Sequence, residues 1–124
     1  MMAAILLIDD DVDFCDVTKR MLKKAGYEVK AVTDLRRSLD CIEKRKSYSA
    51  VIVDFWMGSD DSVPVLDAIA EKMPDVPVVL ISGGGGKFSV ESTKAIGEVS
   101  GTVRFLQKPF RRNELLDVLS SVMR

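Results

Sequence analysis

The stretch Ile5-Leu6-Leu7-Ile8-Asp9-Asp10 is a short aliphatic run that ends in two carboxylates. A continuous aliphatic run of this length predicts a strand that is buried on both faces, as in a parallel sheet. Ala50–Asp54 and Val78–Ser82 repeat the pattern, each with a polar residue at its end. Two further strands are predicted at Tyr27–Val32, whose alternating polarity suits a sheet edge, and at Val103–Gln107.

Segments with apolar residues at helical spacing separate these strands. The first predicted helix, Val12–Ala25, is expected to bury Phe14, Val17, Met21 and Leu22. The other helices are predicted around Leu35–Ile42, from Pro64 to near Pro74, at Val90–Val99 and at Asn113–Met123. Strands that alternate with helices predict an α/β fold, in which a parallel five-stranded sheet carries helices on both faces. We expect a single domain over residues 1–124.

The size and composition of the chain suit one packed domain. Of its 124 residues, 47% are hydrophobic and 30% are charged. No segment approaches the roughly 20 apolar residues that a membrane span needs. The apolar N-terminal run lacks the basic residues that begin a signal peptide. We therefore expect a cytoplasmic chain with no membrane partner.

Charge and missing residue types exclude several functions. Lys and Arg number 18 against 19 for Asp and Glu, a net charge of −1, so no basic excess favours direct nucleic-acid binding. The chain contains no histidine, which excludes Ser-His-Asp catalysis, Cys-His catalysis and imidazole zinc sites. The two cysteines, Cys15 and Cys41, are too few for a disulfide scaffold and indicate reduced thiols.

Chemically useful side chains stand at the ends of four predicted strands. They are Asp9 and Asp10 after the first strand, Asp54 after the third, Ser82 after the fourth and Lys108 after the fifth. The carboxyl ends of parallel strands meet at one edge of a sheet. Clustered carboxylates repel by about 4 kcal/mol per pair at 4 Å and an effective dielectric of 20, which a Mg²⁺ ion relieves. Carboxylates, Mg²⁺, an ammonium and a hydroxyl predict phosphoryl transfer, with Asp54 as the acceptor.

Four segments carry a family resemblance: Ile8–Asp11, Val53–Met57, Leu80–Gly83 and Lys108–Phe110. In this order, and at close to this spacing, they look like the receiver domain of bacterial two-component response regulators. The likeness covers essentially the whole chain and implies a flavodoxin-like (βα)5 fold. It also implies that the chain catalyses only its own phosphorylation and dephosphorylation, and is otherwise not an enzyme.

The resemblance assigns roles to individual residues. Asp54 would be the phospho-acceptor, taking its phosphoryl group from a histidine kinase or a phosphotransfer protein. Asp10 and Asp54 would bind Mg²⁺ directly, together with the backbone carbonyl of Trp56. Asp9 would act on the ion through water.

The resemblance also implies a conformational switch. Ser82 and Lys108 would contact the phosphoryl oxygens, and Phe105 stands at the position of the family's switch aromatic. Movement of Ser82 and Phe105 would remodel the face built from the fourth helix, the fifth strand and the fifth helix. Through that face we expect contact with a downstream protein, and the family also allows pairing with a second copy.

Three features depart from the family pattern. Gly58 stands where the family has Pro and Ser62 where it has Gly, so we expect an altered loop after Asp54. Gly83–Gly86 opens a lengthened segment before the last strand, and we expect phosphorylation to order it. Trp56 is a bulky ring at a position where family members control access of water to the phosphorylated aspartate.

The same residues also have plainer interpretations. Asp9–Asp11 suits the N-cap of a helix, and Asp11 and Asp13 are expected to cap or to be solvated. Lys108-Pro109 suits a turn, with a cis peptide as in the family, and Phe105 suits a core position. Two other functions stay open: a phosphatase of the haloacid-dehalogenase type, which would need Asp9, and a receiver-like scaffold that is not phosphorylated.

Overall fold

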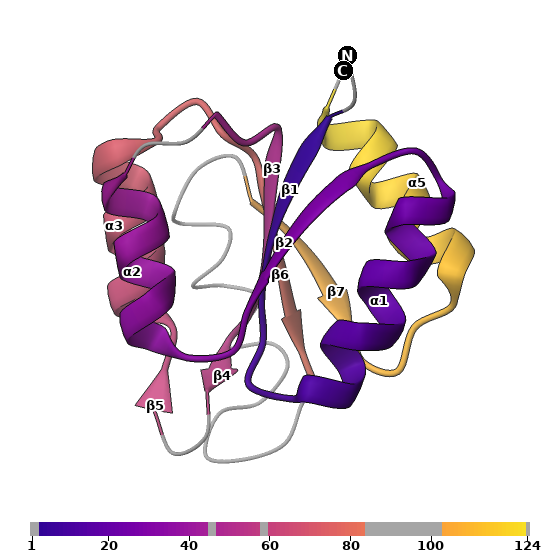
Figure 1. Ribbon diagram of the computed structural model, residues 1–124, viewed down its shortest axis with the longest axis horizontal. Coiled ribbons are helices and arrows are strands. Elements are labelled where there is room, and N and C mark those ends of the chain that lie inside the picture. The colour runs from indigo at the N-terminus through magenta and orange to yellow at the C-terminus, as the bar shows by residue number, and fades with distance from the viewer. Residues whose placement is uncertain (1–2, 45–46, 58–59, 84–102, 124) are drawn as a thin grey trace.

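The computed structural model describes residues 3–44, 47–57, 60–83 and 103–123 (Figure 1). The predicted helix Val90–Val99, most of the loop Gly83–Gly86 and Gly58 lie outside these residues. The fourth helix of the predicted switch face therefore lies outside them as well. The prediction that phosphorylation orders the glycine loop stays a prediction.

Five parallel strands form one sheet in the order β2-β1-β3-β6-β7. Their bounds are β1 Ala4–Ile8, β2 Glu28–Val32, β3 Ala50–Asp54, β6 Val78–Ser82 and β7 Val103–Gln107. Every predicted strand is present, and β3, β6 and β7 agree with the prediction at both ends. The strand order reverses between β1 and β3, which is the doubly wound, flavodoxin-like arrangement that the family resemblance implies.

Helices cover both faces of the sheet (Figure 1). Their bounds are α1 Val12–Lys24, α2 Leu35–Glu43, α3 Val63–Lys72 and α5 Arg112–Val122. Helices α1 and α5 lie on one face, and α2 and α3 lie on the other. Among the described residues, no helix combines the length and the apolar character that crossing a bilayer requires.

The central strands are buried on both faces, as their continuous aliphatic sequences predict. Every residue of β3 and β6 is buried. Alternate residues of β1 point to opposite faces of the sheet. Leu6 and Ile8 belong to the core cluster with α2 and α3. Ile5 and Leu7 belong to the cluster with α1 and α5. Two packed layers therefore hold the carboxyl ends of the strands in fixed positions.

The predicted burial of Val17 is wrong. Its side chain is 66% exposed, and the buried residues of α1 are Cys15, Thr18 and Leu22. At about 100° per residue, Val17 lies about 140° around the helix from Leu22. Spacing from Phe14 alone predicted the wrong side, because the buried face of α1 is centred on Cys15 and Leu22.

A small hairpin that the sequence did not predict follows β3. Strand β4, Trp56–Met57, pairs antiparallel with β5, Asp60–Asp61. The hairpin is fastened at Ser62, whose side chain is fully buried. The Ser62 hydroxyl donates a hydrogen bond to the Asp54 carbonyl, and its N–H donates to the Phe55 carbonyl at 2.7 Å. The residue that replaces the family's glycine therefore fixes the backbone of Asp54.

Replacing Ser62 with Ala should destabilise the fold. Ser62→Ala leaves the buried Asp54 carbonyl without this donor, so we expect the free energy of unfolding to fall by about 1–2 kcal/mol. Urea denaturation followed by circular dichroism measures the change. Ser120→Ala is the matched control, because Ser120 is exposed on α5 and should change stability by less than about 0.5 kcal/mol. Equal stability of the two variants would contradict the assigned role.

Candidate functional site

Four strands end at the same edge of the sheet and carry the predicted site residues there. Asp54 ends β3, Ser82 ends β6, Asp9 and Asp10 follow β1, and Lys108 follows β7. Strands β1 and β3 are the neighbours at which the strand order reverses. In open α/β sheets, ligands bind beyond the carboxyl ends of the strands at this point.

The Lys108 ammonium connects two of the carboxylates. Its Nζ donates to Asp9 Oδ2 at 2.8 Å and lies 3.4 Å from Asp54 Oδ2. The backbone N–H of Lys108 donates to the Ser82 carbonyl at 2.8 Å, which ties the residue to the end of β6. The Lys108–Pro109 peptide is cis, as the family resemblance implies.

Three carboxylates lie together beside this ammonium. Asp9, Asp10 and Asp54 each place one oxygen within 4.8 Å of the others. Asp9 is fully buried and Asp54 is 7% exposed, whereas Asp10 is exposed. Hard oxygen donors at an open rim fit a Mg²⁺ ion that keeps several of its waters. The donor set therefore fits the cation that the sequence predicts.

Backbone N–H groups orient the two buried carboxylates. Asp9 Oδ1 accepts from the N–H of Asp11 at 2.9 Å, and Asp54 Oδ1 accepts from the N–H of Trp56 at 3.2 Å. Each carboxylate thus offers one oxygen to the backbone and the other to Lys108. The role of the Trp56 carbonyl as a metal ligand stays a prediction.

The pKa of Asp54 is raised from 3.8 to about 6. Burial is the largest cause, and repulsion from Asp9 adds to it. The Lys108 charge and the Trp56 N–H act in the opposite direction. Burial lowers the pKa of Lys108, but its hydrogen bond to Asp9 and the charges of Asp54 and Asp9 together raise it above the usual value. Lys108 and the backbone N–H of Trp56 therefore offset only part of the effect of burial and Asp9, and the pKa of Asp54 stays raised.

The two predicted switch residues lie near one another in neighbouring strands. Ser82 is fully buried at the end of β6. Phe105 is half-buried in β7, where it pairs with Leu80. These positions are compatible with the predicted switch, and movement of either side chain stays a prediction.

Sequence reasoning missed two aromatic residues at the site. It assigned Phe14 only to the apolar face of α1, and the structure places the ring 4.0 Å from Lys108 Nζ. Phe110 packs edge-to-face against Phe14, with the ring centroids 5.8 Å apart. Their closeness in sequence to predicted site residues could have indicated this placement, because Phe110 lies two residues after Lys108 and Phe14 lies four residues after Asp10.

Both cysteines carry free thiols. Cys15 is buried under the site, and its Sγ donates to the Asp9 carbonyl at 3.3 Å. Burial, reinforced by the charges of Asp9, Asp11 and Asp16, raises the pKa of Cys15 to about 11. The thiol therefore stays protonated at neutral pH and contributes a hydrogen bond rather than a nucleophile.

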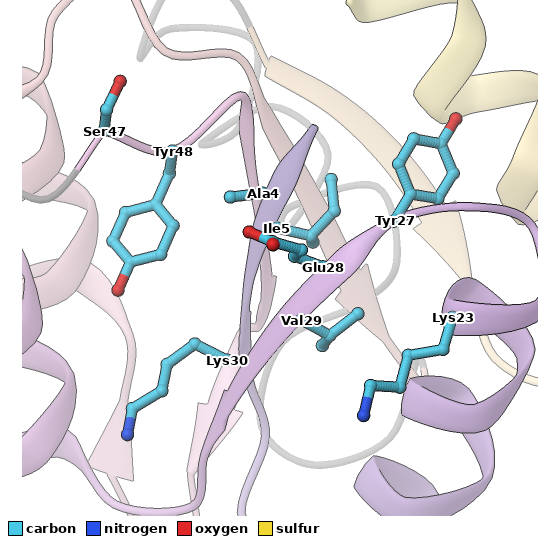
Figure 2. A pocket seen from close by; sticks show the side chains of 9 residues that line it. All are labelled: Ala4, Ile5, Lys23, Tyr27, Glu28, Val29, Lys30, Ser47 and Tyr48. Atoms are coloured by element: carbon cyan, nitrogen blue, oxygen red, sulfur yellow. The ribbon is translucent and has the colours of Figure 1, made fainter. Parts of the chain in front are cut away.

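A cavity of about 710 Å³ lies at the opposite end of the sheet. It is lined by residues that begin β1 and β2, among them Ala4 and Glu28, and by neighbouring side chains (Figure 2). The amines of Lys23 and Lys30 lie on opposite sides of β2 in this view. Because its charged groups do not converge, the cavity gives no chemistry that competes with the carboxylate site.

The raised pKa of Asp54 should appear as a pH-dependent stability. The folded-state pKa of about 6 exceeds the usual 3.8, so the folded chain binds this proton more tightly than the unfolded chain. The contribution of Asp54 to stability therefore falls as the pH rises from 3.8 through about 6. In Mg²⁺-free buffer at pH 7.5, we expect Asp54→Asn to be more stable than wild type by about 1–3 kcal/mol.

Thermal and urea denaturation between pH 3.5 and pH 8 measures this difference, which should vanish at the acid end of the series. Asp67→Asn is the control, because Asp67 is exposed on α3 and should follow the wild-type curve. A stability difference between Asp54→Asn and wild type that is constant across the series would show that Asp54 does not titrate as described.

Comparisons with known proteins agree with this geometry. The family profile described as response regulator receiver domain matches residues 5–120. The nitrogen assimilation regulatory protein NtrX of Azorhizobium caulinodans is 31% identical over 114 residues, which are 90% of this chain and 24% of that protein. A two-component response regulator of Arabidopsis thaliana is 31% identical over 122 residues, 97% of this chain and 22% of that protein. The chain spans less than a quarter of the length of these curated relatives.

Solved structures show the same fold. The receiver domain of NtrX from Brucella abortus is 30% identical with a TM-score of 0.84, covering 96% of this chain and 97% of that one. The chemotaxis protein CheY4 of Vibrio cholerae is 25% identical with a TM-score of 0.84, covering 98% and 99%. Profile, relatives and structures agree over nearly the whole chain, which therefore belongs to the response regulator receiver domain family.

Proposed function

We propose that this domain is a phosphorylation-driven switch in which Asp54 accepts a phosphoryl group from a phosphohistidine. The donor would be a histidine kinase or a phosphotransfer protein. The observation that carries the proposal is the Lys108 ammonium held between the carboxylates of Asp9 and Asp54. This arrangement offers a nucleophile and a positive charge on the same side of the pocket.

The transfer would be a displacement at the phosphorus atom. An Asp54 carboxylate oxygen attacks phosphorus, the phosphorus–nitrogen bond of the donor breaks, and the bonding electrons leave with the imidazole, which takes up a proton. The product is an acyl phosphate on Asp54. Burial favours this attack, because a poorly solvated carboxylate gives up little hydration as it bonds to phosphorus.

The acidic residues would hold the metal ion that the reaction needs. Asp10, Asp54 and the Trp56 carbonyl would bind Mg²⁺ directly, and Asp9 would act through water. When bound, Mg²⁺ would neutralise the clustered carboxylates and the phosphoryl oxygens. Lys108 would pair with a phosphoryl oxygen, and the Ser82 hydroxyl would donate to another.

The output of the switch would be protein contact. We propose that Ser82 and Phe105 move after phosphorylation and remodel the face built from the fourth helix, β7 and α5. A downstream protein, or a second copy of the chain, would bind that face. We propose that residues 1–124 form one receiver domain that works in the cytoplasm. It would act only on its own carboxylate, without direct nucleic-acid or membrane contact.

Burial disfavours the phosphatase alternative. A haloacid-dehalogenase-type reaction would need Asp9 as the nucleophile, but the Asp9 side chain has no exposed surface and Lys108 binds it at 2.8 Å. The Asp54 side chain is 10% exposed and its contact with Lys108 is longer, at 3.4 Å. Asp54 is therefore the more accessible of the two carboxylates.

Phosphorylation can be tested with a small donor. Incubation with acetyl phosphate and Mg²⁺ should add one phosphoryl group, and Asp54→Asn should abolish the addition because it removes the attacking oxygen. Intact-protein mass spectrometry measures the adduct. Asp67→Asn, on the exposed face of α3, should be modified like wild type. An adduct that persists in Asp54→Asn and disappears in an Asp9→Asn variant would favour the phosphatase.

Metal binding can be followed through Trp56, the single tryptophan of the chain. Its backbone N–H donates to Asp54, and its ring packs edge-to-face against Phe55 with the ring centroids 5.0 Å apart, so Mg²⁺ at the carboxylates should change its fluorescence. Asp10→Asn should weaken Mg²⁺ binding at least about 10-fold, because it removes a charged ligand. Asp67→Asn again provides the control. Equal affinities in both variants would exclude Asp10 as a ligand.

A further inference from the structure

We propose that Phe14 is a positioning residue for Lys108, holding the lysine ammonium against the carboxylate pocket through the face of its ring. This inference deepens the proposed function and rests on it for the step that Lys108 assists. The ring itself touches neither Asp54 nor the donor in the proposal. It acts through the lysine.

The contact is direct and short. Lys108 Nζ lies 4.0 Å from the centroid of the Phe14 ring, well inside the ~6 Å at which a cation is attracted by the ring quadrupole. The same nitrogen bonds Asp9 at 2.8 Å and lies 3.4 Å from Asp54. The lysine side chain keeps 22% of its surface exposed. The ammonium thus has carboxylates and an aromatic face as neighbours, with partial access to water.

A lysine needs such support more than most site residues. Its ammonium is a compact charge on a flexible four-carbon chain, with many rotamers available. An aliphatic side chain beside it would remove water without compensation. An aromatic face removes water and supplies negative electrostatic potential, so it favours the position in which the ammonium faces the carboxylates.

Two contacts hold Phe14 in place, one to its ring and one to its backbone. Phe110, two residues after Lys108, packs against it edge-to-face at an angle of 88°. The backbone N–H of Phe14 donates to Asp11 Oδ1 at 3.0 Å, which is the N-cap hydrogen bond of α1. The first contact orients the ring, and the second fixes the helix start that carries it.

Together the contacts form a closed ring that begins and ends at Asp9. The N–H of Asp11 donates to Asp9, Asp11 accepts from the N–H of Phe14, the Phe14 ring faces Lys108, and Lys108 returns to the other oxygen of Asp9. When Asp54 becomes phosphorylated, the ammonium has to redistribute its bonds toward a phosphoryl oxygen. The Lys108 ammonium would stay next to the Phe14 ring while its oxygen partners change.

The test compares three variants. Phe14→Leu keeps an apolar side chain and removes the ring, and Phe14→Tyr restores a ring. Met21→Leu is the matched control, because Met21 is half-buried on the same helix and packs on the same core cluster away from the pocket. Thermal denaturation of each variant checks that the fold is retained.

The first readout is independent of phosphorylation. In lysine-labelled protein, NMR should find the ε-CH₂ protons of Lys108 shifted upfield by the ring current in wild type, Phe14→Tyr and Met21→Leu. The shift should be lost in Phe14→Leu. The signal is assigned by its absence from Lys108→Arg. An unshifted Lys108 signal in the wild-type protein would overturn the inference without the need for any variant.

The second readout is the rate of Asp54 phosphorylation by acetyl phosphate at saturating Mg²⁺. Phe14→Leu should react about 3- to 10-fold more slowly, with Phe14→Tyr recovering most of the rate and the Mg²⁺ affinity unchanged. Equal rates in Phe14→Leu and wild type would overturn the inference and leave the proposed function intact. Wild-type protein that takes up no phosphoryl group would instead overturn the proposed function, while the NMR shift would still decide the position of Lys108.

Discussion

Within the part of the chain that the structure describes, the carboxylate pocket depends on the Lys108 ammonium, whose one positive charge is outnumbered by the carboxylates around it. Three carboxylates approach within 4.8 Å of one another, and Lys108 contacts two of them. A pair of like charges at about 4 Å costs about 4 kcal/mol at an effective dielectric of 20, so the unbalanced pocket opposes folding. Repulsion from Asp9 contributes to the raised pKa of Asp54, after burial, which is the largest cause. The same excess of negative charge would favour a divalent cation in the pocket.

The sheet can hold such a pocket because its central strands are buried on both faces. Packing on two sides leaves the strand ends little freedom, and the parallel register sets them level with one another. Asp54 pairs with Ile81, and Ser82 pairs with Gln107, directly before Lys108. The hydrophobic core therefore holds the backbone at the strand ends in place against the repulsion between the carboxylates.

The strands and the meeting of the site residues could be predicted from the sequence, because general rules for parallel sheets apply to them. Local features, such as the short hairpin and the orientation of one helix residue, could not. Aliphatic runs that end in polar residues predicted the strands, and parallel topology then brought Asp9, Asp54 and Lys108 together. The hairpin β4–β5 escaped prediction because two-residue strands have no periodicity to detect. The orientation of Val17 escaped because one apolar residue can extend a helical pattern without belonging to the buried face.

Asp11 shows why a structural and a functional interpretation of one residue need not compete. From the sequence, Asp11 was expected either to cap the helix or to be solvated, and its carboxylate does accept the N–H of Phe14 as an N-cap. Its own N–H meanwhile donates to Asp9, so the cap also orients a carboxylate of the pocket. The start of α1 is thus built into the site, and the turn that begins the helix fixes both Asp9 and the ring facing Lys108. Without this cap, a polar loop between β1 and α1 would not link the position of Asp9 to the position of the ring that faces Lys108.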